Sequence, residues 1–118
     1  MFGGGRRKFL RNTDKDYSLN NKYGDRKDNR NLIDEWNNIM NMKKLKHKFL
    51  WNLTDFQNLK ANEYDHVMGL LSYNHFDYEI DRVEKTPIQE PSIVELTKKA
   101  IELLSVNEKG FFLLIEGI

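Results

Sequence analysis

A continuous apolar run from Phe111 to Ile115 constrains the fold of this chain more than any other feature. A run that is apolar on both faces suits a parallel strand covered by helices on each side. A predicted helix at 92–105 and a predicted turn at 107–110 precede it, and this order of helix, turn and buried strand is typical of α/β proteins. The sequence therefore predicts an α/β fold with a central, mostly parallel sheet.

The helix at 92–105 has a clear start and one apolar face. Ser92 and Glu95 have the spacing of a capping box, directly after Pro91. Apolar residues then recur every three or four positions, which is the period of a helix face. They are Ile93, Leu96, Ala100, Leu103 and Leu104.

Four elements are predicted earlier in the chain. An apolar stripe predicts a helix from about 31 to 42, with Asn31 as its N-cap. Residues 49–51 are predicted to be a short strand, and 54–62 a short helix that starts with a capping box at Thr54. Residues 66–71 are predicted to be a buried strand.

The Asn-, Asp- and Lys-rich stretch 11–31 has few large apolar residues, so we expect a long surface loop there. The other predicted strands are few and short. They cannot flank a strand as apolar as 111–115 on both sides. We therefore expect the sheet to be incomplete, and the chain to be part of a larger domain.

Composition excludes some classes of protein. The 118 residues contain no cysteine, which excludes a disulfide framework, a thiolate zinc site and a cysteine nucleophile. Nineteen Lys and Arg against eighteen Asp and Glu give a net charge of +1, so overall charge does not favour a nucleic-acid partner. The longest apolar run is too short to span a bilayer. The first residues lack the apolar segment of a signal peptide, so from this sequence alone we expect none.

Two motifs have a structural and a functional interpretation. The triple glycine and two arginines at 3–7 suggest a phosphate loop, but the spacing fits neither the P-loop nor the dinucleotide motif, which favours a tight turn. The basic cluster at 43–48 suggests a nucleic-acid or acidic partner. Because few aromatic residues accompany it, a solvated loop or helix end is the favoured interpretation.

A third motif is an alternation of acidic residues and a histidine at 75–81. In a strand these side chains would share one face and could bind a hard cation, although an exposed polar edge or loop is favoured. They are His75, Asp77, Glu79 and Asp81. The only glycosylation sequon begins at Asn52 and has meaning only in a secreted protein.

Glu116 is the strongest candidate site residue. It directly follows the predicted buried strand, and open α/β sheets place their sites at the carboxyl ends of their strands. A frayed, solvated glutamate is the other interpretation, and position alone does not separate the two.

The segment 91–117 resembles the alkaline phosphatase family, in which a helix, a Lys-Gly turn and a Gly-Phe-Phe-Leu strand lead to a metal-binding Glu-Gly. Four earlier segments resemble the family in the same order. They are Gly3–Arg6, Asn31–Trp36, Trp51–Thr54 and Met68–Arg82. The resemblance implies an α/β/α sandwich that is incomplete in this chain. It also implies hydrolysis of phosphate monoesters through a phosphoserine intermediate, with two zinc ions and one magnesium ion.

The resemblance assigns roles to few residues here. It implies that Glu116 is a magnesium ligand and that Asn52 is a glycosylation site. Animal members of the family also bind calcium through acidic residues where Glu90 and Ser72 stand, and only Glu90 keeps the charge. After Gly117 the family continues with residues that supply zinc ligands. The nucleophilic serine and the zinc ligands have no counterpart here, so we expect no catalytic residue and no activity from this chain alone.

The resemblance also implies a homodimer, a phosphomonoester substrate and a place outside the cell or at its surface. Attachment to the membrane would be only through a lipid (GPI) anchor outside this stretch, and no nucleic-acid partner is expected. The alternative is a non-catalytic, pseudo-enzyme fragment that associates with a full-length subunit. A small nucleic-acid module is a third hypothesis, which the near-neutral charge disfavours.

Overall fold

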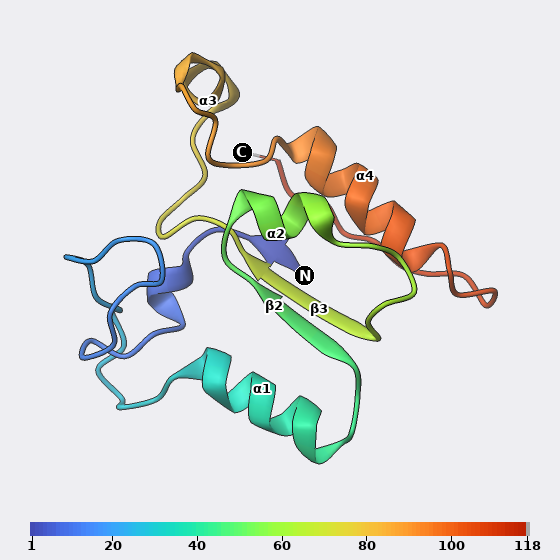
Figure 1. Cartoon of the computed structure of the whole chain (residues 1–118), viewed down its shortest axis with the longest axis horizontal. Helices are drawn as coiled ribbons and strands as arrows, with labels where there is room; N and C mark the ends of the chain where they lie inside the picture. Colours follow the sequence, from blue (N-terminus) through green and yellow to red (C-terminus); the bar gives the residue numbers. More distant parts are fainter. Residues whose placement is uncertain (118) are drawn as a thin grey trace.

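The computed structural model describes residues 1–117, which form a short parallel sheet and five helical segments (Figure 1). In chain order the elements are β1 (Phe2–Gly3), the 3₁₀ helix η1 (Arg6–Lys8), α1 (Leu32–Met42), β2 (His47–Leu50), α2 (Leu53–Asn58), β3 (His66–Leu70), α3 (Glu79–Glu84) and α4 (Ile93–Leu104).

β3 is the central strand of the sheet, whose order is β1-β3-β2. Both neighbours run parallel to β3, and Gly69 lies opposite Phe2 on one side and Leu50 on the other. Parallel neighbours require a crossover connection, which α2 supplies between β2 and β3. The prediction of an α/β fold with a parallel sheet is confirmed.

Helices cover both faces of the sheet, with α1 on one side and α2 and α4 on the other (Figure 1). The cluster on the α1 side consists of Leu10, Ile33, Met68 and Leu70. The cluster on the side of α2 and α4 consists of Leu50, Phe56, Leu59 and Leu71. Successive residues of a strand point to opposite faces, and β3 accordingly contributes Met68 to the first cluster while Val67 packs against the second.

Two helices begin where the sequence predicts. The Asn31 side chain accepts hydrogen bonds from the backbone N–H groups of Ile33 and Asp34, at 3.1 Å each, which caps α1. The Ser92 hydroxyl accepts from the Glu95 N–H at 3.1 Å, and the Glu95 carboxylate accepts from the Ser92 N–H at 2.8 Å. This reciprocal pair is the predicted capping box of α4.

The predicted start of α2 is wrong by two residues. Asn52, and not Thr54, is the N-cap, and its side chain accepts the Asp55 N–H at 2.8 Å. Asparagine is a stronger N-cap than threonine, so the helix begins after Asn52 and not after Thr54. The helix ends at Asn58, because Leu59 is extended.

The strand predictions have mixed outcomes. The strand at 66–71 is confirmed as β3, and β2 covers His47–Leu50 in place of 49–51. The strand alternative at 75–81 is wrong. Residues 75–78 form a loop, as the favoured interpretation expects, and the chain then enters α3. A salt bridge of Arg82 with Glu79, at 2.7 Å and three positions apart, suits a helix.

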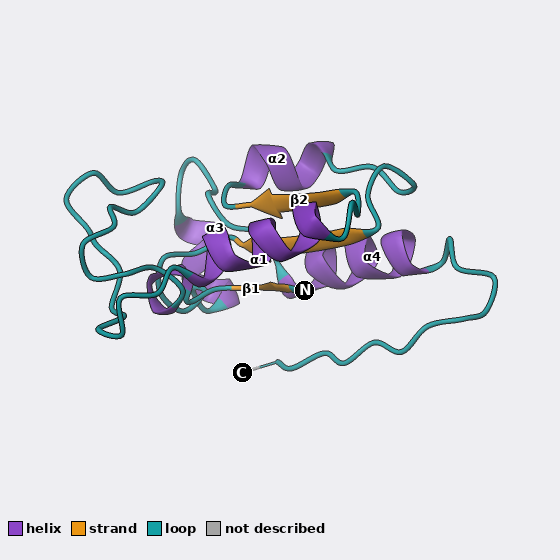
Figure 2. Ribbon diagram, turned by 90° about the horizontal axis from the view of Figure 1, so that it is seen from below, coloured by secondary structure: helices purple, strands orange, loops and turns teal. Residues whose placement is uncertain are grey.

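The predicted strand at 111–115 is also wrong. This segment is extended but pairs with no strand of residues 1–117, and Figure 2 shows it returning past β1 without joining the sheet. Phe112 is 85% exposed and Leu114 is 80% exposed. β1 is only two residues long, so the nearest edge of the sheet offers little backbone for a further ladder.

The stretch 11–31 is an irregular loop up to the N-cap of α1 (Figure 1). Isolated bridges join Arg11 to Arg26 and Lys15 to Tyr23. A tight turn at Gly5 precedes η1 and this loop, and Gly5 there has a φ of +75°, a conformation that costs other residues energy. This turn sets the direction in which Arg6 enters the protein.

We predict that Gly5→Ala lowers the free energy of unfolding by about 1–2 kcal/mol, because alanine is strained in the left-handed region. Gly3→Ala is the matched control, since an added Cβ there has no atom within 4 Å. Urea denaturation followed by tryptophan fluorescence measures both. Equal losses in the two variants would contradict the role given to the turn.

Candidate functional site

The sequence predicts that Glu116 lies at the carboxyl end of a strand, and this prediction is wrong. Glu116 is an exposed residue of the irregular segment after α4. It borders a cavity of about 310 Å³, together with Met1, Phe2 and apolar residues of α4 such as Leu103. Glu116 and Asp65 are therefore the two carboxylates beside a largely apolar hollow.

The residues present do not form a metal centre by themselves. Among residues 1–117, no three or more His, Cys, Asp and Glu side chains gather closely enough to hold an ion. Magnesium requires near-octahedral oxygen coordination, of which Glu116 alone supplies one carboxylate. The magnesium role of Glu116 remains a prediction, and further ligands would have to come from outside these residues.

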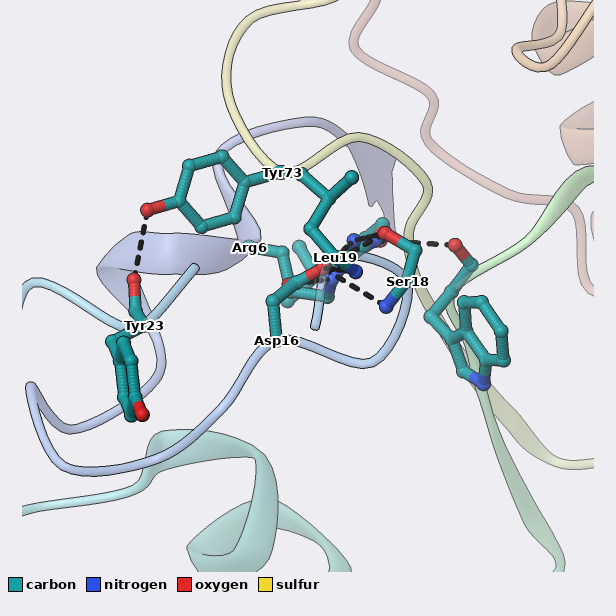
Figure 3. Close-up of polar contacts among 8 residues, drawn as sticks. Arg6, Asp16, Ser18, Leu19, Tyr23 and Tyr73 are labelled. Atoms are coloured by element: carbon teal, nitrogen blue, oxygen red, sulfur yellow. Dashed lines mark hydrogen bonds and ion pairs between the residues drawn. The ribbon is translucent and has the colours of Figure 1, made fainter. Parts of the chain in front are cut away.

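The most developed polar site is built around Arg6, which is 1% exposed (Figure 3). Its Nε donates to Asp16 at 2.7 Å, and its Nη2 donates to Asp16 at 2.8 Å and to Ser18 at 2.7 Å. Its Nη1 donates to the backbone carbonyls of Leu70 at 2.7 Å and Trp51 at 3.1 Å. A guanidinium has five N–H donors, and these five bonds use all of them.

Arg6 lies at the carboxyl ends of two neighbouring strands. Leu70 is the last residue of β3, and Trp51 follows the last residue of β2. Open α/β sheets bind their ligands at this edge. In this chain the backbone carbonyls at this edge bind the Arg6 side chain instead of a ligand. Arg6 in turn connects them to the loop through its salt bridge with Asp16.

Asp16 is as buried as Arg6 and is fully hydrogen-bonded. Besides Arg6, its carboxylate accepts from the Ser18 N–H at 3.0 Å, the Ser18 hydroxyl at 2.8 Å and the Leu19 N–H at 3.2 Å. Burial is the largest single effect on the pKa of Asp16 and raises it. The hydrogen bonds from Arg6 and Ser18 together outweigh burial and lower the pKa from 3.8 to about 2.

This arrangement is structural in character. A carboxylate with a pKa of about 2 is a weak base, and a guanidinium cannot act as an acid near neutral pH. The charges balance, and the pair fixes the loop against the sheet. Sequence analysis identified the glycine turn but missed the pair, whose partners are ten residues apart in an irregular stretch. An arginine next to a glycine turn was the only signal.

The side chains of the other predicted site residues have other partners, although the Ser72 backbone carbonyl accepts the Arg6 N–H at 3.1 Å. Asn52 is half-buried, where it caps α2. Glu90 accepts a hydrogen bond from the Asp77 N–H at 3.0 Å. Ser72 is buried, and its hydroxyl donates to the His75 carbonyl at 3.1 Å. The basic cluster at 43–48 runs from the C-cap of α1 through a turn into the start of β2. This agrees with the favoured interpretation, a helix end and loop.

Comparison with known proteins decides the family. A family model described as alkaline phosphatase matches residues 1–118. The chain belongs to the alkaline phosphatase family. It is 43% identical over 117 residues to the membrane-bound alkaline phosphatase of Bombyx mori. It is 38% identical to the tissue-nonspecific alkaline phosphatase of Felis catus and 36% identical to that of Homo sapiens, each over 120 residues.

These matches cover 99% of this chain but only 20% of the Bombyx mori relative and 22% of each of the other two. The chain therefore spans about one fifth of the length of the alkaline phosphatases that it matches. One of these relatives is membrane-bound by name. Across the helices of residues 1–117, none is both long and apolar enough to cross a bilayer.

We predict that Arg6→Met destabilises the chain by about 3–5 kcal/mol, because it leaves Asp16 as an unpaired buried charge. Lys8→Met is the matched control. Its side chain is 63% exposed and pairs only with the surface carboxylate of Asp25, a type of bond worth about 1 kcal/mol or less. Chemical denaturation measures both. A small loss in Arg6→Met would refute the central role of the pair.

The pair also predicts a pH dependence. The folded pKa of Asp16 is below its ordinary value, so its ionisation stabilises the fold above about pH 4. That stabilisation is lost as the pH falls from about 4 to about 2. The stability advantage of the wild type over Asp16→Asn should therefore shrink across this range. Denaturation at a series of pH values tests it, and a constant difference would contradict the low pKa.

Proposed function

We propose that these residues are a segment of a metal-dependent alkaline phosphatase that hydrolyses phosphate monoesters through a phosphoserine intermediate. The observation that carries the proposal is the family match along the whole chain, together with relatives at 36–43% identity. Phosphomonoesters are the proposed substrates, and a homodimer is the proposed assembly. Magnesium and zinc would supply Lewis-acid chemistry in the whole protein.

The segment contributes scaffold, and no chemical step is assigned to its residues. The sequence has no counterpart of the serine nucleophile or of the zinc ligands that the resemblance implies. Removing the nucleophile from a catalytic unit already loses most of the rate. We therefore propose that the 118 residues alone are inactive, and that Glu116 contributes to a magnesium site only within a longer protein. Its carboxylate oxygen is the kind of donor that magnesium prefers.

The test has two parts. With zinc and magnesium present, the 118-residue chain should hydrolyse p-nitrophenyl phosphate no faster than its Glu116→Ala variant. In the longest natural protein that contains these residues, Glu116→Gln should lower phosphatase activity at least about tenfold, as loss of a metal-site group does. Added magnesium should restore part of that activity.

Glu108→Gln is the matched control in the longer protein. Glu108 is an exposed residue of the turn before the same segment, so its loss should leave activity and magnesium dependence unchanged. Activity of the short chain above its variant would refute its inactivity. Equal activity and equal magnesium dependence in Glu116→Gln and the wild type would refute the role of Glu116.

A second candidate function is binding without catalysis, through association with a full-length subunit. The exposure of Phe112 and Leu114 favours it, because large apolar side chains in an extended segment are suited to docking against another sheet. Co-purification of the monodisperse short chain with a full-length homologue would support it. A short chain that remains unfolded in the presence of the homologue would count against it.

We also propose that the protein acts outside the cell or at its surface, with a lipid anchor outside this stretch. Glycosylation at Asn52 is compatible with the fold. The side-chain oxygen of Asn52 accepts the Asp55 N–H at 2.8 Å, whereas a glycan attaches to the side-chain nitrogen. That nitrogen donates to the Asp55 carboxylate at 2.9 Å, and one N–H remains on it after glycosylation. The cap of α2 can therefore persist in the glycosylated protein.

A further inference from the structure

The family resemblance implies a calcium site in the segment 72–90, with ligands at the positions of Glu90 and Ser72. Calcium takes six to eight oxygen ligands from carboxylates, carbonyls and water, and its affinity depends on the negative charge of the site. We infer that this chain instead holds the segment with two of its own cations, Arg82 and Lys85, and that calcium neither binds nor stabilises it. The inference concerns this segment alone and does not depend on phosphatase activity.

Glu90 already has protein partners. Its carboxylate accepts the backbone N–H of Asp77 at 3.0 Å, and its backbone carbonyl accepts Nη1 of Arg82 at 3.3 Å. These bonds join the two ends of the segment across α3. An ion bound at Glu90 would have to compete with contacts that already fix this turn.

The Asp77 carboxylate, whose own backbone N–H bonds to Glu90, is also paired. Lys85 Nζ donates to the Asp77 carboxylate. The Asp77 carboxylate raises the pKa of Lys85 by accepting this hydrogen bond, with smaller contributions from the charges of Asp77 and Glu90. Lys85 therefore pairs with Asp77 and also feels the negative charge of Glu90.

Arg82 supplies the second cation. Its side chain is 11% exposed and donates two hydrogen bonds to Glu79, at 2.8 and 2.7 Å. It also lines a hollow together with Glu90 and Glu95. A guanidinium is a permanent charge with directional donors, so it orients carboxylates as a bound ion would. The remaining acidic residues of α3, Asp81 and Glu84, are exposed, and water and salt screen their charge.

Ser72 completes the argument. It is buried, and its hydroxyl donates to the His75 carbonyl at 3.1 Å. A neutral hydroxyl contributes no negative charge to a calcium site. Nor does this segment contribute to any cluster of three or more acidic or histidine side chains placed to hold a metal, within residues 1–117.

The experiment is thermal denaturation of the 118-residue chain in EGTA and in about 10 mM calcium chloride, a concentration roughly tenfold above the weakest dissociation constants of extracellular calcium sites, about 1 mM. Ionic strength is matched with sodium chloride. The wild-type midpoint should be the same in both buffers. The double variant Arg82→Gln/Lys85→Gln should have a lower midpoint in EGTA, and calcium should raise it, because the freed carboxylates can then bind the ion.

Lys98→Gln/Lys109→Gln is the matched control, since it removes the same charge at two exposed positions. It should show no response to calcium. A calcium-dependent rise of the wild-type midpoint that magnesium does not reproduce would overturn the inference. A folded double variant that ignores calcium would overturn the claim that the two cations stand in for a metal.

A direct binding measurement decides the matter if the double variant does not fold. Terbium substitutes for calcium and is detected through energy transfer from nearby tyrosine and tryptophan residues. The wild type should give no saturable terbium signal that calcium displaces. A saturable, calcium-displaceable signal that depends on Glu90 would overturn the inference.

Discussion

The buried ion pair of Arg6 and Asp16 is the interaction on which the rest of the structure depends. A buried charge is costly unless it is paired and hydrogen-bonded, and here all five donors of Arg6 find acceptors. Two of these acceptors are the carbonyls of Trp51 and Leu70, at the ends of β2 and β3. The pair therefore joins the turn at Gly5, the long loop and the sheet edge in one contact.

The same pair explains how a polar loop of about twenty residues can have a defined path. The loop contributes little apolar surface, so hydrophobic burial alone cannot hold it. Asp16 provides the anchor, and the chain on each side follows from local hydrogen bonds such as those of Ser18. An arginine that uses backbone carbonyls at the strand ends also occupies the place where such sheets bind ligands.

Local signals in the sequence predicted α1 and α4 well, because caps and apolar periodicity depend on neighbours a few residues away, but they did not predict the short helix α3. Asn31 and Ser92 cap their helices as expected. The prediction of Thr54 as the N-cap of α2 was wrong because Asn52 caps the helix instead. The local pattern alone did not show which of the two residues would be the cap. The parallel sheet was predicted from a run, 111–115, that does not join it. A strand needs a partner, and hydrophobicity along one segment cannot say whether one is present.

The candidate site was less predictable than the fold. Glu116 was identified from its motif. Within residues 1–117 it is not part of a cluster of ligands that could hold a metal, so its predicted role stays a prediction. The Arg6–Asp16 pair was missed because it depends on tertiary contact between a turn and a loop. The pairing of Asp77 with Lys85 was also missed, because an alternating acidic pattern suggests a shared face until the chain is known to turn there.

The central proposal is that these residues act only as a segment of a longer, active member of the alkaline phosphatase family. Sequencing the full transcript across both ends of this coding region tests that claim most directly. The account predicts an open frame with a serine nucleophile upstream and, after Gly117, the residues that the family resemblance implies as zinc ligands. A start codon at Met1 and a stop codon directly after Ile118 would contradict it and leave binding as the function to test.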